Sequence, residues 1–165
     1  VCSSDLSDMD FYAAGGQLAI KLMATHVMEV SSKPHPGGPK EDAVGTFNFW
    51  WAPTVPGNRA NLSLNYARDN WFLNWRINWI DGLRNIDTVN DPTAAPVIRA
   101  IGSISHHDLS FVYEFSERLS VVVGASNLLD RDPPMMAQFG QSNTATELYD
   151  VFGRRYFLRL NYKVL

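Results

Sequence analysis

Two histidines and an aspartate, His106, His107 and Asp108, are the group in this sequence whose residue types best suit a metal ion. They lie where polar and apolar residues alternate, and adjacent residues of a strand point to opposite faces. The two imidazoles therefore cannot easily share one ion, and we interpret the group as the polar end of a strand beside a loop. His26 and His35 stand apart, and we assign them to an interface and a loop. We predict no metal site and no cofactor.

A second charged group lies near the C-terminus, where one polar segment carries Asp130, Asp132, Asp150, Arg131, Arg154 and Arg155. Clustered carboxylates can catalyse hydrolysis as general acid and base. The sequence has no nucleophile elbow, and Gly15-Gly16 lacks the further glycines and the lysine of a phosphate-binding loop. We therefore interpret these residues as solvated loop charges and predict no enzymatic activity. Asn127 and Asp130 are expected to hold the turn that leaves a strand, because short polar side chains bond to nearby backbone.

An aromatic pair, Trp50-Trp51, stands in a polar stretch shortly before Pro53. Exposed aromatic rings can stack against the ring of a sugar or a siderophore, which makes both tryptophans candidate ligand-binding residues. The alternative is that they pack their loop against the rim of the protein. The sequence leaves both interpretations open.

Composition limits the class of protein that can position these groups. The chain has 165 residues, enough for one ordinary domain, and a net charge of −3 without a basic patch, which argues against a nucleic-acid partner. It has no run of 18 apolar residues, as a transmembrane helix would need. The single cysteine, Cys2, excludes an internal disulfide and a multi-cysteine metal site.

The first six residues, Val-Cys-Ser-Ser-Asp-Leu, have neither the basic start nor the apolar stretch of a secretory signal. One reading frame of a common sequencing adapter encodes the same hexapeptide. We therefore interpret residues 1–6 as an artefact and residues 7–165 as the protein-derived domain, truncated upstream. An ordinary polar terminus is the alternative.

Period-two alternation, the signature of β-strands, recurs along the chain. The clearest case is 71–79, where Trp71, Leu73 and Trp75 share one face and Asn74 and Arg76 the other. The segments that alternate are 17–27, 61–66, 71–79, 108–115, 119–126 and 156–164. We predict an all-β fold, an antiparallel meander of about six long strands, with residues before Gly15 as the tail of an earlier strand.

The connections between these strands also alternate, between short and long. The segments 68–70 and 116–118 are tight turns, whereas about 31–60, 83–105 and 128–154 are long and polar. Short turns at one end and long loops at the other are typical of outer-membrane barrels, with the long loops outside the cell. Loops of this length are uncommon in compact domains and usually functional.

Alternation alone does not separate a membrane barrel from a soluble antiparallel domain. Three features favour lipid. The apolar faces carry no Asp, Glu, Lys or Arg, aromatic residues such as Trp71, Trp79 and Tyr162 stand toward strand ends, and the opposite faces are polar without being uniformly charged. Arginine or lysine at mid-bilayer costs about 2–4 kcal/mol, and aromatic girdles mark both membrane interfaces.

Two stretches near the C-terminus resemble the closing strands of TonB-dependent outer-membrane receptors. Residues 123–130 end in Asn127-Leu128-Leu129-Asp130, similar to the N-L-[FL]-D motif of the family's penultimate strand. Residues 153–164 begin with Gly153-Arg154 and are similar to its closing strand, G-R-x-[FY] followed by alternating apolar residues. The alternating residues are Tyr156, Leu158, Leu160, Tyr162 and Val164, and Tyr149 fits the aromatic residue that often precedes the glycine.

The resemblance implies an open segment of a 22-stranded transmembrane barrel whose lumen holds a plug. It implies a place in the bacterial outer membrane and contact with its lipid. TonB would act through a plug that lies upstream, and the barrel assembly machinery would read the C-terminal strand. The family ends on phenylalanine where Val164 and Leu165 stand here, and Pro56-Gly57-Asn58-Arg59 only approximates its Pro-Lys/Arg-Trp strand start.

The function expected from this resemblance is active uptake of a small molecule, namely a siderophore, cobalamin or a carbohydrate. Two alternatives remain: a passive porin-like or adhesin-like barrel without a plug, and a soluble β-sheet domain that binds a partner. Upstream sequence separates the first two, and solubility without detergent would favour the third.

Overall fold

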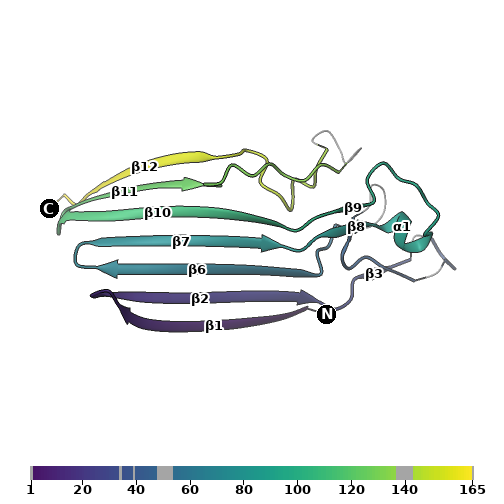
Figure 1. Ribbon diagram of the computed structural model, residues 1–165, viewed down its shortest axis with the longest axis horizontal. Helices are drawn as coiled ribbons and strands as arrows, with labels where there is room; N and C mark the ends of the chain where they lie inside the picture. Colours follow the sequence, from purple (N-terminus) through teal and green to yellow (C-terminus); the bar gives the residue numbers. More distant parts are fainter. Residues whose placement is uncertain (1, 34, 39, 48–53, 137–142, 165) are drawn as a thin grey trace.

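A computed structural model describes residues 2–33, 35–38, 40–47, 54–136 and 143–164, with the backbone alone for residues 2–8, 13 and 32. Most of the described residues belong to one large antiparallel sheet, whose strands lie side by side along the long axis of the molecule (Figure 1). The prediction of an all-β, antiparallel and open fold is confirmed.

The sheet has seven strands in the order β1-β2-β6-β7-β10-β11-β12, and every neighbouring pair is antiparallel. Each strand therefore pairs with the long strands before and after it in sequence, as in a meander. The bounds are β1 Cys2–Ala13, β2 Gly16–Val27, β6 Asn58–Arg68, β7 Trp71–Ile80, β10 Ile104–Ser116, β11 Leu119–Ser126 and β12 Arg155–Tyr162.

Two details differ from the predicted strands. The residues before Gly15, expected to be the tail of an earlier strand, form the full strand β1, which makes seven strands instead of about six. The last strand ends at Tyr162, two residues before the predicted end at Val164, although the Lys163 amide still donates to the Arg118 carbonyl at 3.0 Å. Strands β1 and β12 are the two edges, so the sheet is not closed into a barrel.

The register aligns the predicted faces of neighbouring strands. Leu64 pairs with Trp75, Trp75 with Leu109, and Leu109 with Ala125. One face of β2 to β12, called the apolar face below, is thereby formed by Leu18, Ile20, Leu22, Ala24, Ala60, Leu62, Leu64, Tyr66, Trp71, Leu73, Trp75, Ile77, Trp79, His107, Leu109, Phe111, Tyr113, Val121, Val123, Ala125, Tyr156, Leu158, Leu160 and Tyr162.

The opposite face, called the polar face, is held together by side-chain hydrogen bonds between strands. Asn74 donates to Asn65 at 2.6 Å and to Ser63 at 3.1 Å, and Asn78 donates to Asp108 at 3.5 Å. Cross-strand polar pairs of this kind stabilise a sheet on a hydrated face. These bonds join β6, β7 and β10 across the polar face.

Tight turns join the strands at one end of the sheet. Ala14 and Gly15 both have positive φ, 49° and 77°, the geometry of a two-residue type I′ turn. Asp69, with φ 51°, lies in the turn between β6 and β7, and a β-bulge at Glu114 to Ser116 precedes the turn between β10 and β11. These turns lie at the end opposite the long connections (Figure 1).

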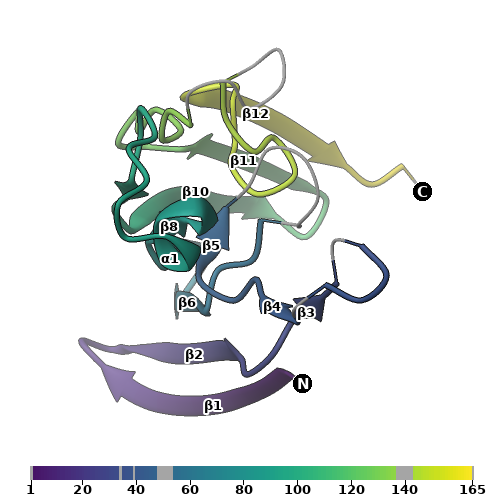
Figure 2. The same cartoon turned by 90° about the vertical axis from the view of Figure 1, so that its right-hand side faces the viewer.

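The long connections carry short elements that the sequence did not predict. They are β3 Ser31–Ser32, β4 Glu41–Asp42, β5 Thr46–Phe47, β8 Leu83–Asn85, α1 Ile86–Asn90 and β9 Ala100–Ile101. β5 and β8 pair in parallel and β8 pairs with β9 to form a small sheet, while the Asn85 side chain caps α1 by accepting from the Asp87 amide. Figure 2 shows the large sheet curving behind these elements.

Candidate functional site

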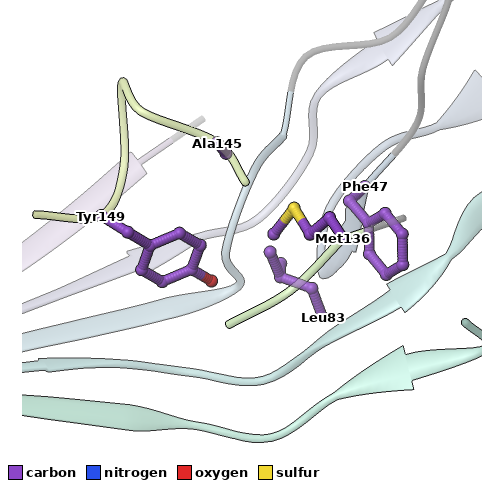
Figure 3. Close-up of a cluster of buried hydrophobic side chains, with 5 residues drawn as sticks. All are labelled: Phe47, Leu83, Met136, Ala145 and Tyr149. Atoms are coloured by element: carbon purple, nitrogen blue, oxygen red, sulfur yellow. The ribbon is translucent and has the colours of Figure 1, made fainter. Parts of the chain in front are cut away.

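The buried core of the described residues lies among the long connections. Its members, called the loop cluster below, are Phe47, Leu83, Met136, Ala145 and Tyr149, each at most 3% exposed. Ile80 and Ile104, which pair across β7 and β10 on the polar side, pack against it. Figure 3 shows Met136 beside Leu83 and Phe47, with the Tyr149 hydroxyl directed toward them. The connections thus fold over the loop end of the polar face.

Three buried side-chain atoms have no hydrogen-bond partner among the described residues: Thr54 Oγ1, the Tyr149 hydroxyl and Nε2 of His106. The side chains of Tyr149 and His106 are 3% and 8% exposed. Burial raises the pKa of Tyr149 to about 12, although the positive charge of Arg59 acts in the opposite direction. The phenol therefore stays neutral at ordinary pH, because its charged form would be poorly solvated there.

His106 and His107 lie on opposite faces, as their adjacent strand positions require. His106 pairs with Asn78 on the polar side, whereas the ring of His107 lies 5.7 Å from that of Trp75 on the apolar face. Nε2 of His107 is 3.3 Å from the Ser105 hydroxyl. In the part of the chain that the structure describes, no three metal-binding side chains come together.

The other two histidines have local partners. His26, at the loop end of β2, places Nδ1 at 2.8 Å from the Asn58 side chain, which in turn donates to Asp81 at 2.7 Å. The carbonyl of His35 accepts from the Gly38 amide at 3.0 Å in a loop turn. Trp50 and Trp51, the candidate ligand-binding pair, lie outside the described residues, so their role stays a prediction.

The Asn127-Leu128-Leu129-Asp130 motif forms a closed turn directly after β11. Asn127, with φ 49°, is 1% exposed. Its side chain accepts from the Arg131 amide and donates to the Arg131 carbonyl, both at 2.9 Å, and its own amide donates to Asp108 at 3.0 Å. The Asp130 amide closes the turn on the Asn127 carbonyl at 2.9 Å. The turn is thereby fixed to β10.

The Gly153-Arg154 motif, distant in sequence, meets this turn at the start of β12. The carboxylate of Asp130 accepts from the Arg154 amide at 2.9 Å and lies 3.6 Å from its guanidinium. The same guanidinium donates to the Leu128 carbonyl at 3.3 Å. Gly153 has φ 68°, a conformation that favours glycine. We call Asn127, Asp130, Gly153 and Arg154 with these bonds the clasp.

Asp150, another acidic residue of this segment, is bound by an arginine of its own. Asp150 binds Arg155 through both oxygens, at 2.6 and 3.1 Å, and accepts from the Phe152 amide at 2.9 Å. Burial raises the pKa of Asp150, but the contacts with Arg155 and Phe152 outweigh it and hold the pKa below its usual value. Asp130 and Asp150 therefore bind separate arginines instead of sharing a proton.

The predicted closing strand is exposed along its whole length. All eight residues of β12 are exposed, with Tyr156 at 73% and Leu158 at 74%. Tyr156, Leu158, Leu160 and Tyr162 pair with Ala125, Val123, Val121 and Leu119, so they lie on the apolar face as the alternation predicted. Val164 follows the strand and is exposed.

An open groove of about 790 Å³ lies beside the clasp. One wall runs from Gly102 to Ser105 at the start of β10, and the other from Leu129 to Asp132 after β11. Its polar groups include the serine hydroxyls and the side chains of Asp130, Arg131 and Asp132. Neither the groove nor the loop cluster carries a periodic pattern, so sequence reasoning missed both.

Comparison of the chain with family models, with curated proteins and with solved structures gave no match. Among the described residues no helix is long and apolar enough to cross a membrane.

Proposed function

We propose that this chain is the C-terminal barrel segment of a TonB-dependent outer-membrane receptor, which takes up a small molecule across the bacterial outer membrane. The observation that carries the proposal is the apolar face. Between the strand ends it extends over β2, β6, β7, β10, β11 and β12 without an Asp, Glu, Lys or Arg, and Arg68, which pairs with Trp71 at the turn end of β6, is the charged residue in phase with it. Large side chains on this face stay exposed, among them Leu22, Trp75, Leu158 and Leu160. An apolar surface of this extent needs a cover, and lipid is the cover we propose.

The position of the aromatic residues supports a bilayer. At the turn end, Trp71 lies 5.1 Å from Tyr66 and 5.9 Å from Phe111, measured between ring centroids, and Trp79 stands near the loop end of the same strand. Eight residue steps of about 3.3 Å separate the two tryptophans, roughly 26 Å along the strand. With a tilt of about 40° this spans roughly 20 Å, similar to the ~25 Å apolar band of such barrels.

A hollow in this face also suits hydrocarbon. It has a volume of about 410 Å³ and is lined by Phe111, Tyr113, Phe115, Val121 and Val123. Such a lining offers almost no hydrogen bond to water, whereas a flexible acyl chain can fill it. In a soluble sandwich, side chains of a second layer would occupy this space.

The polar face and the connections above it support a receptor of the type proposed. The polar face would line the lumen, and the loop cluster with its groove would form part of the outer vestibule that captures ligand. TonB would act through a plug encoded upstream, and the barrel assembly machinery would recognise β12. These roles, and the absence of enzymatic activity, rest on the resemblance of the clasp and β12 to the family's closing strands.

The test is the gene itself and the place of its product. We expect the reading frame upstream of Ser7 to encode further alternating strands preceded by a plug domain, and the full-length protein to fractionate with the outer membrane. Upstream strands without a plug would support a porin-like or adhesin-like barrel instead. A full-length protein that is soluble and monomeric without detergent would overturn the membrane proposal.

A further inference from the structure

The position of β12 on β11 needs a cause outside the two strands. Each strand carries an apolar residue on the polar face, Val122 in β11 and Phe157 in β12, which pairs with Gly124. The runs 121–123 and 156–158 are therefore apolar in both alternation phases. A shift by one residue would put Arg155 and Arg159 on the apolar face, and the side-chain pattern opposes it. A shift by two residues keeps every side chain on its own face, so the pattern does not exclude it.

The length of the connection between β11 and β12 cannot by itself fix the register of β12. The connection runs from residue 127 to residue 154, and the entropy of closing a loop changes only slowly with the number of residues. β12 is also an edge strand, so β11 is its one partner in the described sheet. Register must therefore be fixed by contacts close to the strand ends.

The clasp lies at that position. Ser126 and Arg155 form the first pair of the ladder. On one side, Asn127 is tied to β10 through Asp108, and on the other the Asp130 carboxylate holds the amide of Arg154, the residue just before β12. The Arg154 guanidinium returns to the Leu128 carbonyl at 3.3 Å. The last residue before the ladder is thus positioned by atoms of the turn that directly follows β11.

We propose that the clasp alone sets the register of β12, with Asp130 as the positioning residue, and that residues 133–151 are not needed for it. The connection between the strands is then a replaceable module. The sequence of the loop can then vary with the molecule that the loop binds, while β12 keeps its register on β11.

A disulfide reporter in the complete chain, refolded in detergent micelles, tests the proposal. With Cys2→Ser throughout, the pair Val122→Cys and Arg159→Cys reports the native register, because these residues are directly opposite. The pairs Val122→Cys with Phe157→Cys and Val122→Cys with Asn161→Cys report shifts by two residues in the two directions. We expect Asp130→Ala to lower the yield of the native disulfide and to raise that of a shifted pair, each severalfold.

Three further variants make the result specific. Asp130→Asn keeps an oxygen for the Arg154 amide and should retain the native register. Asp150→Ala removes the shorter ion pair to Arg155, which does not reach β11, and should also retain it. Replacement of residues 133–151 by a short glycine-serine linker should leave the native disulfide unchanged.

Native register in Asp130→Ala would overturn the role of the clasp. Loss of register in the linker variant with the clasp intact would overturn the claim that the loop is replaceable. Should Asp130→Ala not refold, the comparison of the Asp130→Asn and linker variants decides, since both must keep the native disulfide. None of these outcomes depends on transport or on a bilayer.

Discussion

The loop end and the body of the sheet differ in how far their apolar side chains are buried. In the connections, Phe47, Leu83 and Ile86 are at most 1% exposed. On the body, the larger apolar face has no such shelter, and Trp75, near its centre, remains 37% exposed. The smaller set of apolar residues is buried by the protein, whereas the larger set is left outside.

The contrast shows where the chain supplies its own core. The connections bury apolar groups by folding over Ile80 and Ile104 at the end of the polar face. Along the strands, the alternation places apolar residues on one side, where Leu22, Trp75, Leu158 and Leu160 remain exposed. A single curved sheet cannot bury that side by itself. The body therefore depends on its surroundings, which we propose to be lipid, while the loop cluster does not.

Loss of Phe47 should have the largest effect, and it should be local. Truncation of a fully buried phenylalanine typically costs about 3–5 kcal/mol. We expect Phe47→Ala to speed hydrogen exchange of the Arg84 and Asn85 amides, which bond to Gly45 and Arg99 at the base of the loop cluster. The measurement is exchange of the folded chain in detergent.

The matched control for Phe47→Ala is Leu158→Ala, on the apolar face. Because Leu158 is 74% exposed, its truncation should leave the same two amides unchanged. Equal exchange in the Phe47→Ala variant and in the parent chain would show that the loop cluster is not a cooperative unit.

A charge introduced on the apolar face should have the next largest effect on stability. It tests whether the body of the sheet is covered by lipid. In the full-length protein in phospholipid vesicles, Leu64→Arg should cost about 2–4 kcal/mol of unfolding free energy. The neighbouring Ser63→Arg, on the polar face, should cost little. Urea titration of both variants measures the difference. The membrane proposal fails if the two substitutions have equal cost, or if Leu64→Arg is harmless in lipid.

The difference between the two regions also explains what the sequence predicted. The strands β2, β6, β7, β10, β11 and β12 were predicted because alternation repeats several times within them, and β11 has the predicted bounds. β1 was expected only as the tail of an earlier strand. The connections contain strands of two or three residues, too short for any period. The pairing of Thr46 with Arg84 depends on distant segments meeting, which no local pattern encodes.

The candidate site was also predicted in its local features and missed in its long-range contacts. The types of Asn127 and Asp130 indicated a turn, because their side chains bond to nearby backbone. The contact from Asp130 to the Arg154 amide was not predicted, since it depends on how the chain returns after a long connection. The burial of Tyr149 was missed because Met136 and Leu83, which shelter it, carry no periodic signal.

Alkaline pH should weaken the loop cluster more than the body of the sheet. The pKa of Tyr149 is about 12 in the folded chain, above the usual value of 10.0. The folded state thus holds this proton more tightly than the unfolded state. The associated stability is fully present below pH 10 and is lost as the pH rises from 10 to 12, on the order of 2–3 kcal/mol.

Thermal unfolding in detergent, followed by near-ultraviolet circular dichroism at pH 8 and pH 11, measures this loss. Tyr149→Phe is the control, because it removes the titrating group and leaves every other tyrosine in place. The variant should lose less stability than the parent chain between the two values. Equal losses would place the Tyr149 phenol in contact with water.

The smallest expected effect is that of Tyr149→Phe at neutral pH, and its sign is informative. Removal of a hydrogen-bonded hydroxyl normally destabilises a protein, but this hydroxyl is buried without a partner in the described residues. The substitution removes an unsatisfied polar atom and keeps the ring that fills the loop cluster. We expect stability to stay level or to rise by up to about 1 kcal/mol, measured by the same thermal unfolding at pH 8. A loss of more than about 1 kcal/mol would mean that the hydroxyl has a partner, such as an ordered water. The loop cluster would then be held by a polar contact as well as by the burial of apolar side chains.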